Sequence, residues 1–274
     1  MFKIIIMALL IFIGMVGYDS ITDKTQPTTP VQQEQQKISK HEKSAAMALF
    51  TSLLPPKEEW PSPVHKFYLA FNMDEVIDPI RQNPNWTGLD AMSRDIPQAL
   101  IAIEDHAFYN HGAIAVEGIL RAALANINAG EVVQGGSTLT QQFVKNVFLS
   151  HEQSMERKIE EAVLSLMLED NYSKDEILEL YLNTTYFGAG STGIKQASRT
   201  YFGKAPSALT LAEAAVIASL PYAPTSLNPL ENPEGCKKRQ LLVLAAMHKY
   251  GMINQGQLAE AKAEKIHLTN GTVM

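Results

Sequence analysis

The spacing of apolar residues predicts that the chain from residue 95 onward is almost entirely helical. Apolar side chains recur at i, i+3, i+4 and i+7 over residues 113–129, a period typical of an amphipathic helix. Residues 96–103 form an apolar run that leads into two adjacent carboxylates, Glu104 and Asp105. Strand-like residues occur only at 66–71, so we expect a mostly α fold. Further helices are predicted after Ser137, over 156–170, from Ser173, from Thr210, over 237–250 and over 255–263.

Polar residues at the predicted helix starts support these boundaries. Side chains able to cap a helix N-terminus are Asp95, Ser137 or Thr138, Ser173 with Glu176, and Thr210 with Glu213. In the helix over 156–170 the apolar residues form one stripe, made of Ile159, Ala162, Val163, Leu166 and Met167. Arg157 and Glu161 lie four residues apart on a face away from this stripe, where a surface ion pair is the simplest interpretation.

Composition and charge narrow the class of protein. The 274 residues are 46% hydrophobic and 19% charged, which is globular composition for one large domain or two small ones. The net charge of −6 argues against nucleic acid as a partner. Cys236 is the only cysteine, so an internal disulfide framework and a cysteine-rich metal site are excluded.

The first 59 residues read as a membrane-targeting segment followed by a linker. After Lys3, residues 4–17 carry no charge and, as a helix, span about 21 Å, less than the ~30 Å hydrocarbon core. Residues 1–21 are therefore a signal peptide or an uncleaved signal-anchor; a buried core helix is the alternative. Residues 22–59 read as a flexible linker with a short helix.

Glu104 is the first candidate for chemistry. A carboxylate beside Ile103 and Phe108 is expected to be partly desolvated, which raises its pKa and suits a general base or acid near neutral pH. The alternative is a solvated Glu–Asp pair at a helix end.

The second candidate is the helix start after Gly135 and Gly136. Its backbone N–H groups suit an anion. Along this helix Gln141 and Lys145, and Gln142 and Asn146, form two i, i+4 rows that could bind phosphate or sugar hydroxyls. A solvated polar face explains the same residues. The nucleotide P-loop pattern is absent.

Four motifs in a fixed order give the chain a family resemblance. They are E-D-x-x-F-x-x-H from Glu104 to His111, G-x-S-T-x-x-Q-Q-x-x-K-N from Gly135 to Asn146, R-K-x-x-E from Arg157 to Glu161, and S-K-x-x-I-L-E-x-Y-L-N from Ser173 to Asn183. The chain resembles the glycosyltransferase family 51 domain, the peptidoglycan glycosyltransferase of penicillin-binding proteins and their monofunctional relatives. The resemblance covers about residues 93–252 and includes Arg239.

This resemblance implies a lysozyme-like, two-lobed helical domain with a catalytic cleft. We expect that domain over residues 60–264, with residues 265–274 as a tail. The implied reaction polymerises lipid II into β-1,4-linked glycan, inverts C1 and releases undecaprenyl pyrophosphate. A lytic, glycan-cleaving enzyme and an inactive cell-wall scaffold are the alternatives.

The resemblance also implies roles for individual residues. Glu104 is the expected general base, and the second glutamate, Glu161, lies at the pyrophosphate with Lys145 and Arg157. Residues expected to shape the cleft or hold the donor are Asp105, Phe108, His111, Thr138, Gln141, Gln142 and Asn146. Glu161 is also a candidate ligand, through the pyrophosphate, for a divalent cation such as Mg²⁺ or Mn²⁺; no organic cofactor is expected.

The implied partners are lipid II, the growing glycan and the cytoplasmic membrane, with transpeptidases and other cell-wall synthesis proteins as candidates. The expected location is the bacterial inner membrane, with the catalytic domain on its outer, periplasmic face. Ser-x-x-Lys, Ser-Asp-Asn and Lys-Thr-Gly motifs are absent, so polymerisation without peptide crosslinking is expected unless the chain is a fragment. Ala113, Ala115 and Gln153 depart from the family pattern, and we expect Gln153 to weaken donor binding.

Overall fold

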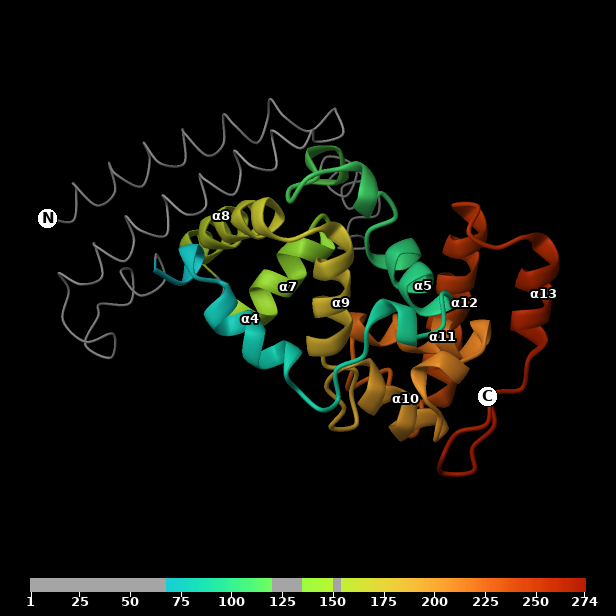
Figure 1. Ribbon diagram of the computed structural model, residues 1–274. Coiled ribbons are helices and arrows are strands. Elements are labelled where there is room, and N and C mark those ends of the chain that lie inside the picture. The colour runs from blue at the N-terminus through green and yellow to red at the C-terminus, as the bar shows by residue number, and fades with distance from the viewer. Residues whose placement is uncertain (1–67, 120–134, 150–153) are drawn as a thin grey trace, which may run out of the picture. The chain divides into compact units, whose positions relative to one another are not determined.

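The computed structural model describes residues 68–119, 135–149 and 154–274 (Figure 1). The chain divides into two compact units, Met1–Val76 and Ile77–Met274. The α-helices are α4 (Asp74–Arg81), α5 (Asp95–Glu104), α7 (Leu139–Phe148), α8 (Met155–Asn171), α9 (Lys174–Thr184), α10 (Ile194–Phe202), α11 (Leu211–Ser219), α12 (Pro233–Lys249) and α13 (Gln255–Ala263). Short 3₁₀ turns are Leu89–Ala91, Phe108–Asn110, Pro206–Ala208 and Leu220–Tyr222.

The predicted mostly α fold is confirmed. Within the described ranges, β pairing is limited to two isolated bridges, Tyr186 with Thr192 and His267 with Val273. The strand-like interpretation of residues 66–71 is wrong for the part that can be checked, because residues 68–71 are helical and the Asn72 N–H donates to the Tyr68 carbonyl at 3.1 Å. Aromatic residues raise strand propensity, but this local hydrogen bonding overrides it.

Within the unit Ile77–Met274 the helices pack as two groups. The first contains α5, α11 and α12, with α13 packed on α11 and α12; the second contains α7, α8 and α9 (Figure 1). Helix α10 contacts both α9 and α11. This arrangement agrees with the predicted two-lobed helical domain. The C-terminus of α5 carries Glu104, so the candidate base stands at the end of a helix of the first group.

The predicted caps are largely confirmed. Thr138, Ser173 and Thr210 each close a capping box with the residue three positions on. Asp95 is a correction, because α5 has Arg94 in the cap position without a side-chain cap bond, and Asp95 is the first helical residue. A carboxylate in the first turn still interacts favourably with the helix dipole, so an Asp near the start of a helix is common even where it does not cap the helix.

Helix α8 turns a different face to the core from the one its apolar stripe suggested. Ile159 is 62% exposed and Leu166 is 38% exposed, whereas Leu164 and Leu168 are buried on the same side as Glu161. The helix packs against α7. The sequence pattern failed here because it assigned a carboxylate to solvent, and in this fold neighbouring cations compensate the buried charge.

Two features of the C-terminal part of the domain differ in detail from expectation. Helix α12 begins at Pro233, one turn before the predicted start at Lys237, and the Asn232 side chain accepts from the Gly235 N–H at 2.9 Å. Residues 265–274, predicted as a tail, fold back on themselves: Ile266 and Met274 exchange backbone hydrogen bonds of 3.0 and 2.9 Å. The Thr269 N–H donates to the carbonyl of Tyr201, which attaches this hairpin to α10.

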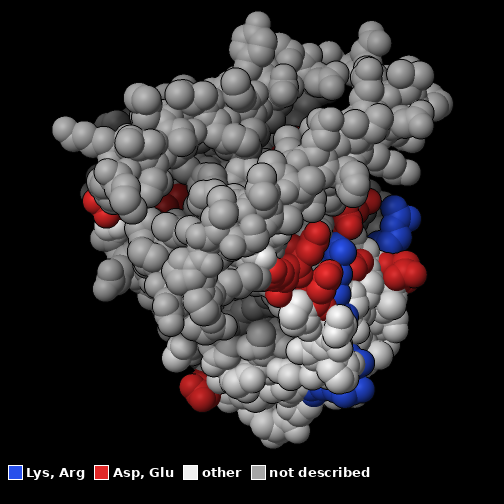
Figure 2. Space-filling model, turned by 60° about the vertical axis from the view of Figure 1, so that its left-hand side comes forward, with Lys and Arg blue, Asp and Glu red and all other residues white. Residues whose placement is uncertain are grey.

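Several predictions fall partly or wholly outside the described residues, namely the segments 1–59, most of the helix over 113–129, and Gln153. Among the helices that are described, none combines the length and the apolar character needed to cross a bilayer. On the face seen in Figure 2, acidic and basic side chains of the described residues lie next to one another. Arg81 and Glu176 form an ion pair 2.9 Å long between α4 and α9.

Candidate active site

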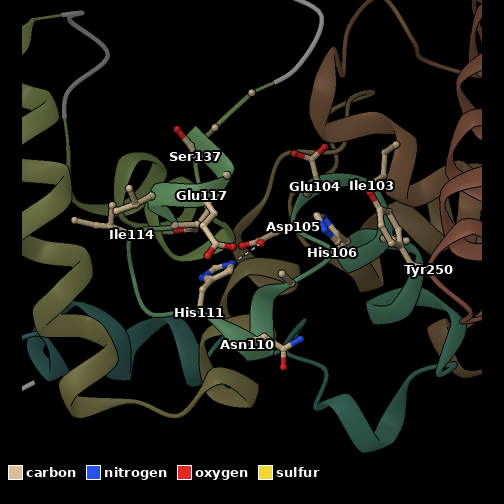
Figure 3. Close-up of a pocket in the computed structure, with 18 residues that line it drawn as sticks. Ile103, Glu104, Asp105, His106, Asn110, His111, Ile114, Glu117, Ser137 and Tyr250 are labelled. Carbon is tan, nitrogen blue, oxygen red and sulfur yellow. Dashed lines mark hydrogen bonds and ion pairs between the residues drawn. The ribbon is translucent and has the colours of Figure 1, made fainter. Parts of the chain in front are cut away.

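Glu104 lines a pocket of about 400 Å³. The pocket is lined by the last turn of α5, residues 105–107, 110–111 and 114–118, the stretch 135–138, and Tyr250 (Figure 3). In the close-up, Glu104 lies on the side of Ile103 and Tyr250, while Asp105 and His111 meet on the other side. A volume of this size falls in the range of small-molecule binding sites.

The environment of Glu104 suits a general base. Burial raises the pKa of its carboxyl group above the ordinary value, and a hydrogen bond from Gln142 and the charges of Arg239 and Lys145 oppose that rise. Gln142 Nε2 donates to Glu104 Oε2 at 3.0 Å. A carboxylate that is desolvated yet still hydrogen-bonded can take a proton near neutral pH.

Asp105 connects the candidate base to the second motif. Its Oδ1 lies 2.6 Å from His111 Nε2, and its Oδ2 accepts from the Leu139 N–H at 3.0 Å, at the first residue of α7. A carboxylate is favoured at a helix N-terminus. His111 Nδ1 faces the Gly112 carbonyl at 2.6 Å, so this nitrogen carries a proton. The hydrogen bond with Asp105 raises the pKa of His111 despite partial burial.

Three predicted site residues are buried in the surrounding structure. Thr138 lines the pocket, and its hydroxyl donates to the Ala113 backbone carbonyl at 2.7 Å. Gln141 is 3% exposed and its amide oxygen accepts from the Thr138 N–H, which closes the capping box. Phe108 is fully buried with Lys174 Nζ 4.4 Å from its ring centroid. Gln141 therefore does not share an exposed row with Lys145.

The cations and the second glutamate form a cluster on α8. Glu161 is 1% exposed; its Oε1 pairs with Lys158, and its Oε2 lies 3.6 Å from Arg157 Nη1. Lys158 Nζ also donates to Ser137 Oγ at 3.1 Å, which joins the cluster to the rim of the pocket. Arg157 Nε is buried and has no hydrogen-bond partner among the described residues.

A metal held by protein side chains alone does not fit this arrangement. Both oxygens of Glu161 face cationic groups. Elsewhere in the described ranges, no group of three or more His, Cys, Asp or Glu side chains is placed to hold an ion.

The last two predicted site residues, Lys145 and Asn146, are exposed on α7.

Three residues near the site received no role from the sequence. Lys158 is the lysine of the R-K-x-x-E motif, and only Arg157 and Glu161 of that motif were given roles. Tyr181 is buried and its hydroxyl donates to Gln142 Oε1 at 3.0 Å, although its place among apolar residues suggested core packing. Arg239 acts on Glu104 from α12, and its guanidinium lies 4.0 Å from the ring centroid of Tyr222. All three residues match positions of the family's motifs, and this match was the sequence signal that could have identified them.

Comparisons with known proteins give consistent results. The family model described as Transglycosylase matches residues 73–248. Penicillin-binding protein 1A of Neisseria flavescens is 45% identical over 68% of this chain and 23% of its own length. A protein of Cupriavidus necator that carries the name transglycosylase is 40% identical over 71% of this chain and 84% of its own length.

A solved structure, penicillin-binding protein 1A of Haemophilus influenzae, is 33% identical over 48% of this chain and 16% of its own, with a TM-score of 0.34. That score is too low to support a statement about the fold. The chain thus spans about a quarter of the Neisseria flavescens relative but most of the Cupriavidus necator relative.

Proposed function

This chain belongs to the transglycosylase family, and on that premise we propose that it is a peptidoglycan glycosyltransferase that polymerises lipid II into β-1,4-linked glycan. The observation that supports this most directly is the Glu104 carboxylate. It has a raised pKa, accepts a hydrogen bond from Gln142 and opens onto a pocket whose rim is joined to a cationic cluster.

In the proposed reaction the 4-hydroxyl of lipid II attacks C1 of the growing glycan. A bond forms between this oxygen and C1, while the bond from C1 to the phosphate oxygen breaks and the pyrophosphate leaves with the electron pair. Glu104 takes the hydroxyl proton. Attack opposite the leaving group inverts C1 and gives the β link.

The leaving pyrophosphate gains negative charge, so positive groups near it stabilise the transition state. We assign this role to Lys145 and Arg157, with Lys158 next to Arg157 at Glu161. Glu161 orients the two cations of α8 and holds them close to each other, because its one carboxylate pairs with both.

The remaining predicted residues act in support. Asp105 and His111 hold the loop after α5 against the start of α7, and Asn146 offers an exposed amide next to Lys145 for a sugar or phosphate oxygen. Any Mg²⁺ or Mn²⁺ is proposed to enter with the pyrophosphate, where its chemistry would be charge neutralisation.

The proposed substrates have long lipid tails, so we also propose that the enzyme works at the outer face of the bacterial inner membrane. The apolar stretch at residues 4–17 supports that location as a tether. Transpeptidases and other cell-wall synthesis proteins are proposed partners, because polymerised glycan must be crosslinked by another active site.

One assay tests the proposed function against its rivals. Purified protein is incubated with lipid II and a divalent cation, and polymer is measured for wild type, Glu104→Gln and the control Glu260→Gln, which removes an exposed carboxylate on α13. Polymer from wild type and the control, but not from folded Glu104→Gln, is expected. Fragments released from preformed glycan would support a lytic enzyme, and inertness would support a scaffold.

A further inference from the structure

A line of three side chains connects helix α9 to the candidate base. The Tyr181 hydroxyl on α9 donates to Gln142 Oε1 at 3.0 Å, and the other end of the same amide, Nε2, donates to Glu104 Oε2 at 3.0 Å. Tyr181 is 1% exposed. Both hydrogen bonds are direct, so the line crosses from α9 through α7 to the end of α5.

The orientation of the Gln142 amide matters because its two ends are alike in size and opposite in hydrogen bonding. Rotated by half a turn, the amide would present its oxygen to the Glu104 carboxylate, and two acceptors would face each other. Burial raises the pKa of the Tyr181 phenol, so this hydroxyl keeps its proton and remains a donor. A permanent donor at Oε1 favours the orientation in which Nε2 points at Glu104.

We propose that Tyr181 is a positioning residue for catalysis, which holds the Gln142 amide as a donor to Glu104 and thereby favours the ionised base. This rests on the proposed function, in which Glu104 takes the proton of the attacking hydroxyl. The line also distinguishes the two oxygens of the base. Oε2 accepts from Gln142, and no hydrogen bond from the described residues reaches Oε1, so Oε1 is the oxygen better placed to take the proton.

Other charged groups act on Glu104 from the helices around it. Arg239 on α12 and Lys145 on α7 favour its ionised form, and Asp105 next to it opposes ionisation. All three stay unchanged when the Tyr181 hydroxyl is removed. A change in the titration of Glu104 then reports on the amide alone.

The test measures lipid II polymerisation against pH for wild type, Tyr181→Phe, Gln142→Ala and the double variant. Tyr181→Phe removes the hydrogen bond that holds the Gln142 amide as a donor to the charged Glu104. Weaker donation to Glu104 is expected to move the acidic limb of kcat/KM upward by about one pH unit. Below the limb Tyr181→Phe is then about tenfold slower, and above it the rate returns toward wild type. The double variant should be no worse than Gln142→Ala, since both changes remove the same interaction.

Tyr201→Phe is the matched control. Tyr201 is fully buried on α10 and its hydroxyl donates to the Phe187 carbonyl at 2.7 Å, so this variant loses a comparable hydrogen bond outside the site. It should lower thermal stability without moving the acidic limb. A fluorotyrosine at position 181 keeps the fold and is a stronger donor, so it should move the limb downward.

Two results would overturn the positioning role. One is a Tyr181→Phe enzyme slowed equally at every pH, as expected if the ring only fills space. The other is a double variant whose losses are the sum of the single ones. If wild type makes no polymer at any pH, the proposed function fails first and the role of Tyr181 fails with it.

Discussion

Replacing Asp105 with asparagine should destabilise the domain by an amount that depends on pH. The ion pair with His111 is 2.6 Å long, and the two side chains are only 8% and 16% exposed, with His111 the more exposed. Asparagine can still accept from the Leu139 N–H and can donate to a neutral His111, so the contact is weakened, not abolished. The loss is the difference between a charged and a neutral hydrogen bond plus some distortion, about 2 kcal/mol at pH 6.

The sign of the pH dependence follows from the pKa of His111, which is raised in the folded state. Its contribution to stability is fully present below the unfolded pKa, about 6.5, and is lost as pH rises through the raised folded value. In Asp105→Asn most of that contribution is absent at every pH. The difference between the two proteins should therefore shrink to about 1 kcal/mol at pH 9.

Thermal unfolding from pH 6 to pH 9 measures this directly. For a domain of this size the expected deficit in Tm is about 5 °C at pH 6 and about 2 °C at pH 9. Asp175→Asn is the control, because Asp175 is exposed and its partner, the Tyr109 hydroxyl 2.7 Å away, does not titrate in this range. A deficit that stays constant or grows toward pH 9 would refute the assignment of the charged pair.

Two further changes test the environment of α8. Leu168→Ala should cost about 2–5 kcal/mol in urea unfolding, whereas Leu166→Ala on the exposed side should cost less than about 1 kcal/mol; equal losses would contradict the observed face of the helix. Glu161→Gln should lower stability by about 2 kcal/mol at low salt, because it leaves Arg157 and Lys158 close together without a counter-charge. Adding salt should recover part of this loss, and a salt-independent loss would argue that the carboxylate only fills space.

Local signals predicted the helices well and their faces less well. The capping boxes at Thr138, Ser173 and Thr210 depend on residues three positions apart, so the sequence contains the whole interaction. The short helices α4 and α10 were not predicted. Helix α4 contains Pro79, and the apolar residues of α10 lie mainly in its first and last turns, with few between them.

The site shows where sequence reasoning stops. Glu104 was identified from its apolar neighbours and its motif, and burial does raise its pKa. Gln141 and Gln142 are adjacent and looked equivalent, yet the first closes a capping box and the second reaches the base. The buried position of Glu161 and the contact of Tyr181 with Gln142 depend on packing between helices, which the spacing along one helix does not contain.

The contacts at the end of α5 also constrain how the domain moves. Glu104 with Gln142, and Asp105 with Leu139, both cross from α5 to α7. A hinge opening between these helices would break both hydrogen bonds to carboxylates at once, which costs roughly 3 kcal/mol of free energy. The open conformation would then be populated in less than about one molecule in a hundred. The end of α5 and the start of α7 therefore keep their spacing when other parts of the domain move, and the Glu104 carboxylate keeps its orientation.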